Sequence, residues 1–90
     1  MHIRFSARAR IQVREAYVWY ESKQSGLCER FLSTLDSTVS LIVQFPSALP
    51  FRYKRQRGAW LQKFLFVIFY RQTKSGIHVF AVLHCKRNVG

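Results

Sequence analysis

The sequence is poor in acidic side chains, with four Asp and Glu residues against fifteen Lys and Arg and a formal net charge of +11. All four carboxylates lie in the first 36 residues: Glu15, Glu21, Glu29 and Asp36. From Ser37 onward the chain therefore offers no carboxylate that could act as a general base. A chain this basic selects acidic partners, and nucleic acid, a membrane face and an acidic protein segment all remain open as counterparts.

Cysteine is scarce and poorly spaced for metal or redox chemistry. Cys28 and Cys85 stand far apart, without a CxxC pair or a histidine-rich neighbourhood, so we expect two free thiols, no metal and no cofactor. Long apolar runs are missing too, because the run from Phe64 to Tyr70 is far shorter than the ~20 residues that span a bilayer. No charged and then apolar leader opens the chain. We expect a soluble, cytoplasmic protein with no membrane partner.

Apolar side chains, in contrast, are plentiful. The sequence is 49% hydrophobic and 16% aromatic, which is typical of a folded globule and too apolar for a disordered tail. A chain of this length buries one core and has no surface to spare for a second. We therefore expect residues 1–90 to form a single domain.

The first half of the chain has the periodicity of two helices. After a short strand from His2 to Phe5, Ser6 is a suitable N-cap for a helix that should end near Gln24. Ser25-Gly26 then breaks the chain. A second helix should begin near Leu27 and end before Pro46. The apolar stripes expected to be buried are Ala9, Val13, Ala16, Tyr17 and Tyr20 on the first helix and Phe31, Leu32, Leu35, Val39 and Ile42 on the second.

After Pro46 and Pro50 the pattern changes to extended segments rich in aromatic and β-branched residues. Three antiparallel strands fit this pattern: Phe51 to Arg57, Trp60 to Arg71 and Ile77 to Lys86. The hairpin turns are expected at Gly58-Ala59 and Ser75-Gly76. The fold class is therefore α+β, with the order β-α-α-β-β-β.

Both faces of the expected sheet carry apolar side chains. In the last strand, strict alternation puts Ile77, Val79, Ala81 and Leu83 on one face and His78, Phe80, Val82 and His84 on the other. The middle strand divides in the same way into Phe64, Phe66, Ile68 and Tyr70 against Leu65, Val67 and Phe69. Two helices can cover only one face, so we expect an open apolar face rimmed by basic residues.

An open face of this kind suits a partner that has an apolar helix or strand flanked by carboxylates. The alternative is that the sheet covers itself, with the aliphatic stems of Arg52, Lys54 and Lys63 folded over the aromatic rings. The sequence leaves both possibilities open.

Four stretches resemble the RelE/ParE toxin superfamily. The pair Tyr17 and Tyr20 with Gly26-Leu27 and Arg30-Phe31 resembles the "GLG..F" connection between its helices, and Ile42 with Pro46 resembles the "I...P" close of the second helix. Arg57 and the run from Phe64 to Tyr70 resemble the "R......FPY.I.Y" hairpin of ParE-like proteins, except that Leu65 replaces the proline. The segment from Val79 to Asn88 resembles the "I.A.LH..RN" terminal strand.

This resemblance implies the toxin of a plasmid stabilisation (type II toxin–antitoxin) system, neutralised by a cognate antitoxin in a toxin–antitoxin hetero-oligomer. ParE-like members bind DNA gyrase and block its cycle, whereas RelE-like members cleave mRNA on the ribosome. Operon DNA would be contacted only through the antitoxin. The apolar middle strand lacks the polar "R.GDYR" hairpin of the nuclease branch, which favours gyrase inhibition over a metal-independent endoribonuclease. An inactive or truncated relative is a further alternative.

Candidate site residues follow from these readings. For contact with a target or an antitoxin we expect the basic and aromatic residues of the sheet: Arg52, Lys54, Arg57, Trp60, Phe64, Phe66, Arg71, His84 and Arg87. If the protein were an RNase, the catalytic residues would be Arg57, Arg71, His84 and Arg87. Tyr53 and Trp60 could also stack on bases, although such residues are more often cross-strand pairs.

Overall fold

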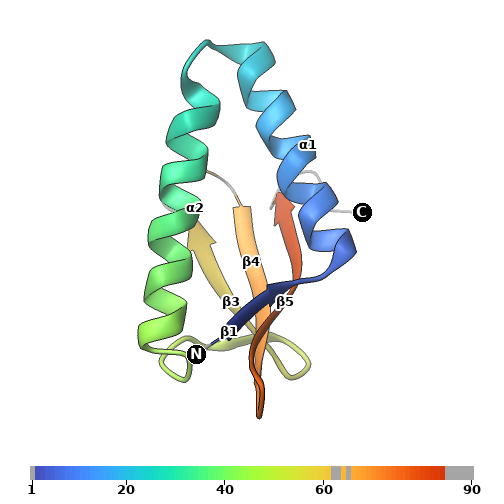
Figure 1. Cartoon of the computed structure of the whole chain (residues 1–90), viewed down its shortest axis with the longest axis vertical. Coiled ribbons are helices and arrows are strands. Elements are labelled where there is room, and N and C mark those ends of the chain that lie inside the picture. The colour runs from blue at the N-terminus through green and yellow to red at the C-terminus, as the bar shows by residue number, and fades with distance from the viewer. Residues whose placement is uncertain (1, 62–63, 65, 85–90) are drawn as a thin grey trace.

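The computed structural model describes residues 2–61, 64 and 66–84 and consists of a helical hairpin on a mixed sheet (Figure 1). In chain order the elements are β1 (His2–Phe5), α1 (Ala7–Lys23), α2 (Leu27–Gln44), β2 (Phe51–Tyr53), β3 (Gln56–Leu61), β4 (Phe66–Thr73) and β5 (Gly76–His84). Neither helix in this part of the chain is long and apolar enough to cross a bilayer.

Local signals set the ends of both helices. The Ser6 side chain accepts a hydrogen bond from the Ala9 N–H at 3.0 Å, so the predicted N-cap of α1 is confirmed. Gly26 precedes α2 with a φ of 87°, a left-handed conformation that glycine adopts without steric cost. The helices therefore begin and end close to the predicted positions.

The buried stripes of the helices are narrower than predicted. Ala9, Ala16 and Tyr20 of α1 are buried, as are Phe31, Leu35 and Ile42 of α2, with Val13 and Val39 partly buried beside them. Tyr17 and Leu32, however, are 37% and 36% exposed, so their predicted burial was wrong. Both residues lie at the margin of their stripe, where helix rotation decides between core and solvent.

The sheet has five strands in the order β1-β5-β4-β3-β2, with β1 parallel to β5 and the other pairs antiparallel. The predicted position of the first hairpin turn was wrong. Gly58 and Ala59 do not form a turn but lie within β3, paired with Phe69 and Ile68. The turn lies at Lys54, which adopts a φ of 52°, unusual for a residue with a side chain.

The stretch predicted as one strand from Trp60 to Arg71 is divided between β3 and β4, with Phe64 in the turn that joins them. The predicted turn at Ser75-Gly76 joins β4 and β5 and is confirmed. Several predicted features lie outside the described residues: Lys63, Leu65, the end of the last strand at Lys86, and the closing motif with Cys85, Arg87 and Asn88.

The core lies between the sheet and the two helices, which cover the same face of the sheet (Figure 1). At its centre is a group of aromatic rings, in which Tyr20 and Phe31 of the helices contact Phe64 and Phe66 with centroid separations of 5.0–6.1 Å. This face is called the helix face below, and the opposite one the outer face.

A β-bulge in β5 changes which residues occupy each face. Tyr70 pairs with Val79 and Phe69 pairs with Ala81, so Phe80 has no opposite residue in β4. Val82 therefore joins Val79 in the core. The predicted strict alternation along β5 was wrong beyond this point, because one extra residue inverts every side chain that follows it.

Candidate partner-binding groove

The outer face carries a groove of about 620 Å³ over the two central strands. Its floor is formed by apolar side chains of β4 and β5: Phe69, Phe80, Ala81 and Leu83. The β-bulge creates this floor, because it places Phe80, Ala81 and Leu83 together on the face that the helices do not cover. A partly exposed apolar floor of this kind is a surface that suits a partner.

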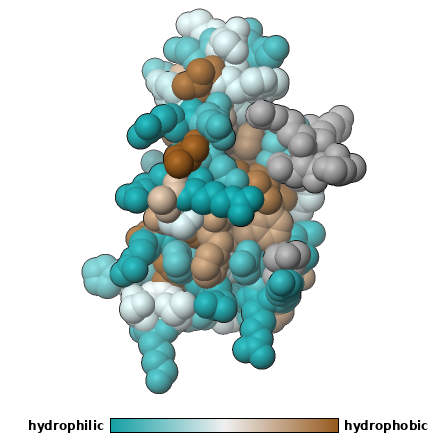
Figure 2. Space-filling model, turned by 90° about the vertical axis from the view of Figure 1, so that its right-hand side faces the viewer, coloured by the Kyte–Doolittle hydropathy of each residue, from teal (hydrophilic) through white to brown (hydrophobic). Residues whose placement is uncertain are grey.

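Polar and basic side chains border the groove. Arg8 and Ser6 contribute from the start of α1, and Arg52 and Gln56 from β2 and β3. Figure 2 views the molecule from the side on which α1 and β5 lie, and shows apolar side chains gathered at mid-height with hydrophilic ones around and across them. The predicted basic rim is present, but the apolar face is only partly open, because Ala81 is 8% exposed and Phe69, Phe80 and Leu83 are of intermediate exposure.

The alternative, in which the stems of Arg52, Lys54 and Lys63 fold over the rings, holds for Arg52, and Arg71, which it did not name, makes a similar contact. The Arg52 guanidinium lies 5.6 Å from the centroid of the Trp60 ring, and the Arg71 guanidinium lies 5.4 Å from that of Phe80. Gly58 permits the first contact, because a β-carbon there would collide with the Arg52 side chain. Trp60 nonetheless remains 46% exposed, so Arg52 leaves much of its ring uncovered.

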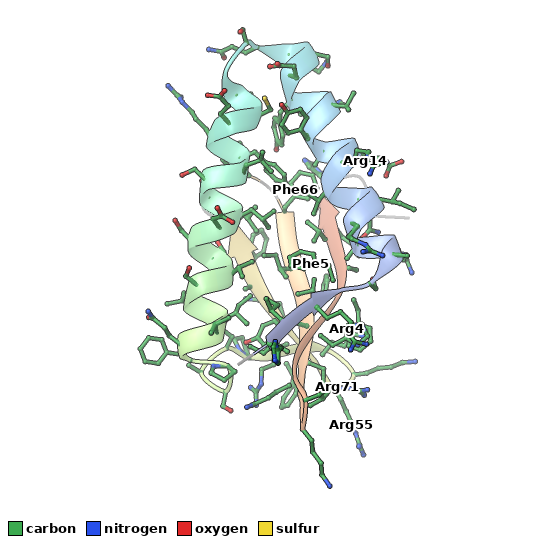
Figure 3. All side chains as sticks on the ribbon, in the orientation of Figure 1. Arg4, Phe5, Arg14, Arg55, Phe66 and Arg71 are labelled. Atoms are coloured by element: carbon green, nitrogen blue, oxygen red, sulfur yellow. The ribbon has the colours of Figure 1, made fainter. Side chains whose placement is uncertain are left out.

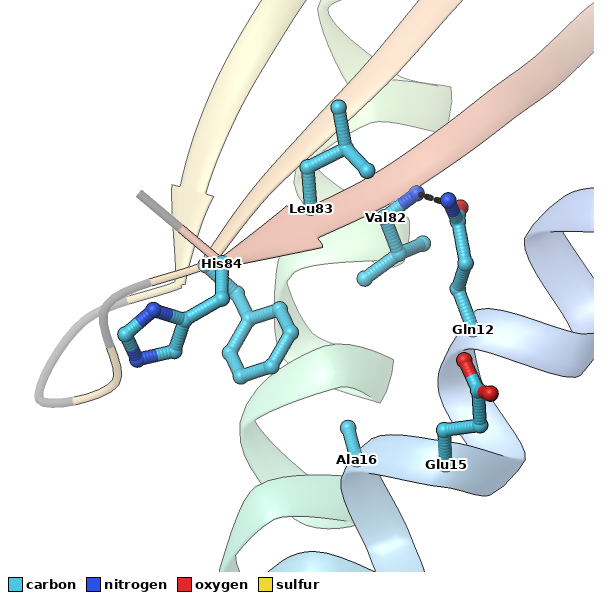
Figure 4. Close-up of a pocket in the computed structure, with 7 residues that line it drawn as sticks. Gln12, Glu15, Ala16, Val82, Leu83 and His84 are labelled. Carbon is cyan, nitrogen blue, oxygen red and sulfur yellow. Dashed lines mark hydrogen bonds between the residues drawn. The ribbon is translucent and has the colours of Figure 1, made fainter. Parts of the chain in front are cut away.

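A second, smaller hollow of about 140 Å³ lies between α1 and the end of β5 (Figure 4). Gln12 lines it and accepts a hydrogen bond from the Val82 N–H at 2.8 Å, at a point where β1 no longer pairs with β5. The His84 ring contacts the Phe66 ring edge-on at 5.0 Å, with Trp19 further away at 6.5 Å. The exposed Glu15 also lines this hollow, which is much smaller than the groove and therefore a less suitable docking surface.

The structure separates the predicted site residues into three groups. Arg52, Trp60 and Arg71 lie on the outer face beside the groove, and Lys54 is exposed in the β2–β3 turn. Phe64 and Phe66 are only 8% and 4% exposed and belong to the aromatic core, so they cannot contact a partner without unfolding. Arg87 lies outside the described residues.

Arg57 points to the helix face and is held by its own chain. Its guanidinium donates a hydrogen bond to the Leu49 carbonyl and lies 4.1 Å from the centroid of the Phe51 ring. Its neighbour in β4, Tyr70, is fully buried. These contacts give Arg57 a role in holding the loop that follows α2.

The residues proposed for RNA cleavage are not brought together. Arg71 pairs with His78, six positions before His84 on β5, which corresponds to a separation on the order of 20 Å. The two side chains also lie on opposite faces, because Arg71 contacts Phe80 on the outer face and His84 contacts Phe66 in the core. A proton-transfer residue must lie within hydrogen-bond reach of its substrate, so His84 and Arg71 do not form one catalytic centre.

Sequence reasoning missed most of the groove itself. Arg8 and Gln56 were assigned no role, and Phe80 was placed on the same face as Val82. The alternating pattern did signal an apolar outer face, but it could not reveal the bulge that gathers Phe80, Ala81 and Leu83 on it. Among the described residues, no group of three or more His, Cys, Asp or Glu side chains could hold a metal ion.

Comparison with known proteins identifies the architecture. No family model and no curated protein matches the sequence. Among solved structures, a chain of the "Chromosomal ParDE TA system from P. aeruginosa" superimposes with a TM-score of 0.69 over 93% of this chain and 95% of that one, at 14% identity. The chain has a ParE-like fold.

The ParE-like fold agrees with the α+β class and with the RelE/ParE resemblance of the motifs. The sheet differs in detail from the predicted one, since the basic segment after Pro50 forms the separate short strand β2 and part of β3.

Proposed function

We propose that this chain is the toxin of a type II toxin–antitoxin system, that it acts as a ParE-like inhibitor of DNA gyrase, and that an antitoxin neutralises it. The observation that carries the proposal is the ParE-like fold, which it shares with a ParDE system chain over nearly its whole length. The motifs from Tyr17 to Asn88 point to the same branch.

The groove supports the antitoxin part of the proposal. Its apolar floor fits a short row of Leu, Ile or Val side chains from an extended or helical segment. Arg8 and Arg52 at its borders would pair with carboxylates that flank this row. We therefore expect the antitoxin to present an acidic segment with apolar anchors.

The separation of the candidate catalytic groups favours inhibition over RNA cleavage. With His84 packed against Phe66 and Arg57 bonded to Leu49, these two side chains are engaged in the fold. A protein that inhibits by binding needs no assembled proton-transfer residues, so this arrangement is compatible with a gyrase inhibitor.

The proposal is tested by adding the purified chain to a gyrase supercoiling reaction and, separately, to a translating ribosome extract. We expect loss of supercoiling without mRNA cleavage. A His84→Gln variant should retain most of the inhibition, whereas an RNase would lose orders of magnitude in rate on losing its proton-transfer residue. Messenger RNA cleavage abolished by His84→Gln, with the fold intact, would overturn the proposal in favour of the RNase.

A further inference from the structure

A row of cationic and imidazole side chains crosses three strands of the outer face, apart from the groove floor. Arg4 of β1 is paired with His78 of β5, and His78 is paired with Arg71 of β4. Ile3 and Phe5 pack on the core, so Arg4 between them points to the outer face. Neighbouring strands lie about 4.8 Å apart, so the row spans roughly 10 Å.

Phe80 holds two members of the row in place. The His78 ring lies against the Phe80 ring with centroids 4.3 Å apart, and the Arg71 guanidinium lies 5.4 Å from the Phe80 centroid. Side chains ordered before binding lose less conformational entropy when a ligand arrives. The row is therefore better prepared to bind than isolated surface arginines.

Two hollows adjoin the row. One, of about 200 Å³, is lined by Arg4 and His78 together with His2 and the hydroxyl-bearing Thr73 and Ser75. The other, of about 470 Å³, is lined by Arg71 and Arg55 together with Arg57, Phe51 and Gln72, and it reaches the helix face, to which Arg57 points. Figure 3 shows Arg4, Arg71 and Arg55 in the lower half of the molecule and Arg14, on α1, in the upper half.

None of the four acidic side chains competes for this surface. All four acidic residues lie in α1 or α2, on the other side of the sheet. The positive potential of the row is therefore not neutralised by neighbouring acids, and an anionic ligand would meet guanidinium groups whose planar donors match phosphate oxygens.

We propose that Arg4, His78 and Arg71 form a binding track for the phosphodiester backbone of nucleic acid. A polymer with evenly spaced charges suits a row of three donor side chains on neighbouring strands, whereas a single small anion would need only one or two of these donors. Arg4 and Arg71 supply permanent charge, and His78 supplies a ring N–H donor. Contacts of this kind add affinity without reading sequence, and the proposal is independent of the gyrase and antitoxin assignments.

The test is the binding of fluorescently labelled single-stranded DNA and RNA oligonucleotides to the purified chain across a salt series, followed by anisotropy. Each phosphate contact contributes about 0.7 to the slope of log affinity against log salt for single strands. Arg4→Ala and Arg71→Ala should each reduce the slope by about that amount and weaken binding several-fold. Arg71→Lys should keep the slope while losing affinity, because the charge stays but the bidentate donor does not.

The matched control is Arg14→Ala, which removes the same charge from an exposed position on α1 away from the row. It should change affinity and slope much less than either variant of the row. Circular dichroism and thermal unfolding of each variant check that the fold is kept.

Two results would overturn the track. In the first, the double variant Arg4→Ala/Arg71→Ala keeps the wild-type slope of log affinity against log salt, or its slope decreases no more than that of the double variant Arg14→Ala/Arg30→Ala. In the second, polyglutamate of the same charge binds as tightly as the oligonucleotides, which would indicate a surface for acidic protein. A preference for DNA over RNA, or the reverse, would identify the source of the phosphates.

Discussion

Tyr70 joins the sheet to the loop that follows α2. Its side chain is fully buried, and its hydroxyl donates a hydrogen bond to the Pro46 carbonyl at 3.0 Å. Burial raises the pKa of the Tyr70 phenol, and the positive charge of Arg57 opposes this effect. Burial raises the pKa of Tyr20 as well. Both tyrosines therefore make the free energy of unfolding depend on pH in the alkaline range.

A tyrosine with a raised pKa in the folded state keeps its proton to higher pH there than in the unfolded chain. Its contribution is therefore complete below the unfolded-state pKa of about 10 and is lost as pH rises through the folded-state value. We expect Tyr70→Phe to lower the free energy of unfolding by about 1 kcal/mol near neutral pH, because the hydrogen bond is lost. When the pH is raised above about 10, the variant should lose less stability than the wild type, because it has no phenol at this position to ionise. Urea unfolding at both pH values measures this, and equal alkaline losses in the two proteins would contradict it.

At the scale of elements, the pairing of β1 with β5 depends on Gly76. This residue has a φ of 136° and lies opposite His2, and a β-carbon there would collide with the His2 backbone. Gly26, before α2, also has a positive φ, but nothing surrounds its β-carbon position. The two glycines therefore differ in what a methyl group would meet.

Gly76→Ala should lower the free energy of unfolding by about 2–3 kcal/mol, because backbone strain adds to a collision that only strand separation relieves. Gly26→Ala, the matched control, should cost about 1–2 kcal/mol from its left-handed conformation alone. Chemical denaturation of the two variants and the wild type measures both. Equal losses, or a larger loss for Gly26→Ala, would argue against the collision at His2.

Elements fixed by local chemistry could be predicted from sequence, and those fixed by pairing could not. The N-cap at Ser6 and the turn at Gly76 carry their own signals, and both were found. The β2–β3 turn was missed because Lys54 adopts a positive φ without being glycine. The bulge at Phe80 was missed because its extra residue can be recognised only from the pairing of β5 with β4. Most of the groove floor was therefore not predicted either.

At the scale of the whole molecule, charge and apolar surface are divided between the two layers. The helices carry every carboxylate, while the outer face of the sheet carries the groove and the arginines around it. A partner with acidic and apolar residues would be drawn to the sheet and away from the helices. The proposed antitoxin, with an acidic segment and apolar anchors, would meet both demands.

Leu83→Asp places a charge on the groove floor, where Leu83 is only partly buried and the fold should tolerate the change. Leu41→Asp, at a residue of α2 that is 48% exposed, makes the same substitution on the other side of the molecule. Neither changes the basic side chains. The pair therefore separates loss of antitoxin docking from the effects of an added carboxylate.

The most direct measurement is growth of bacteria that express the chain with and without its proposed antitoxin, which is to be sought as a small acidic protein in a neighbouring reading frame. The expected result is growth arrest by the chain alone, relief by the acidic protein, and relief that persists for Leu41→Asp but fails for Leu83→Asp. No arrest by the soluble, folded chain, or full relief of Leu83→Asp, would contradict a toxin neutralised through this groove.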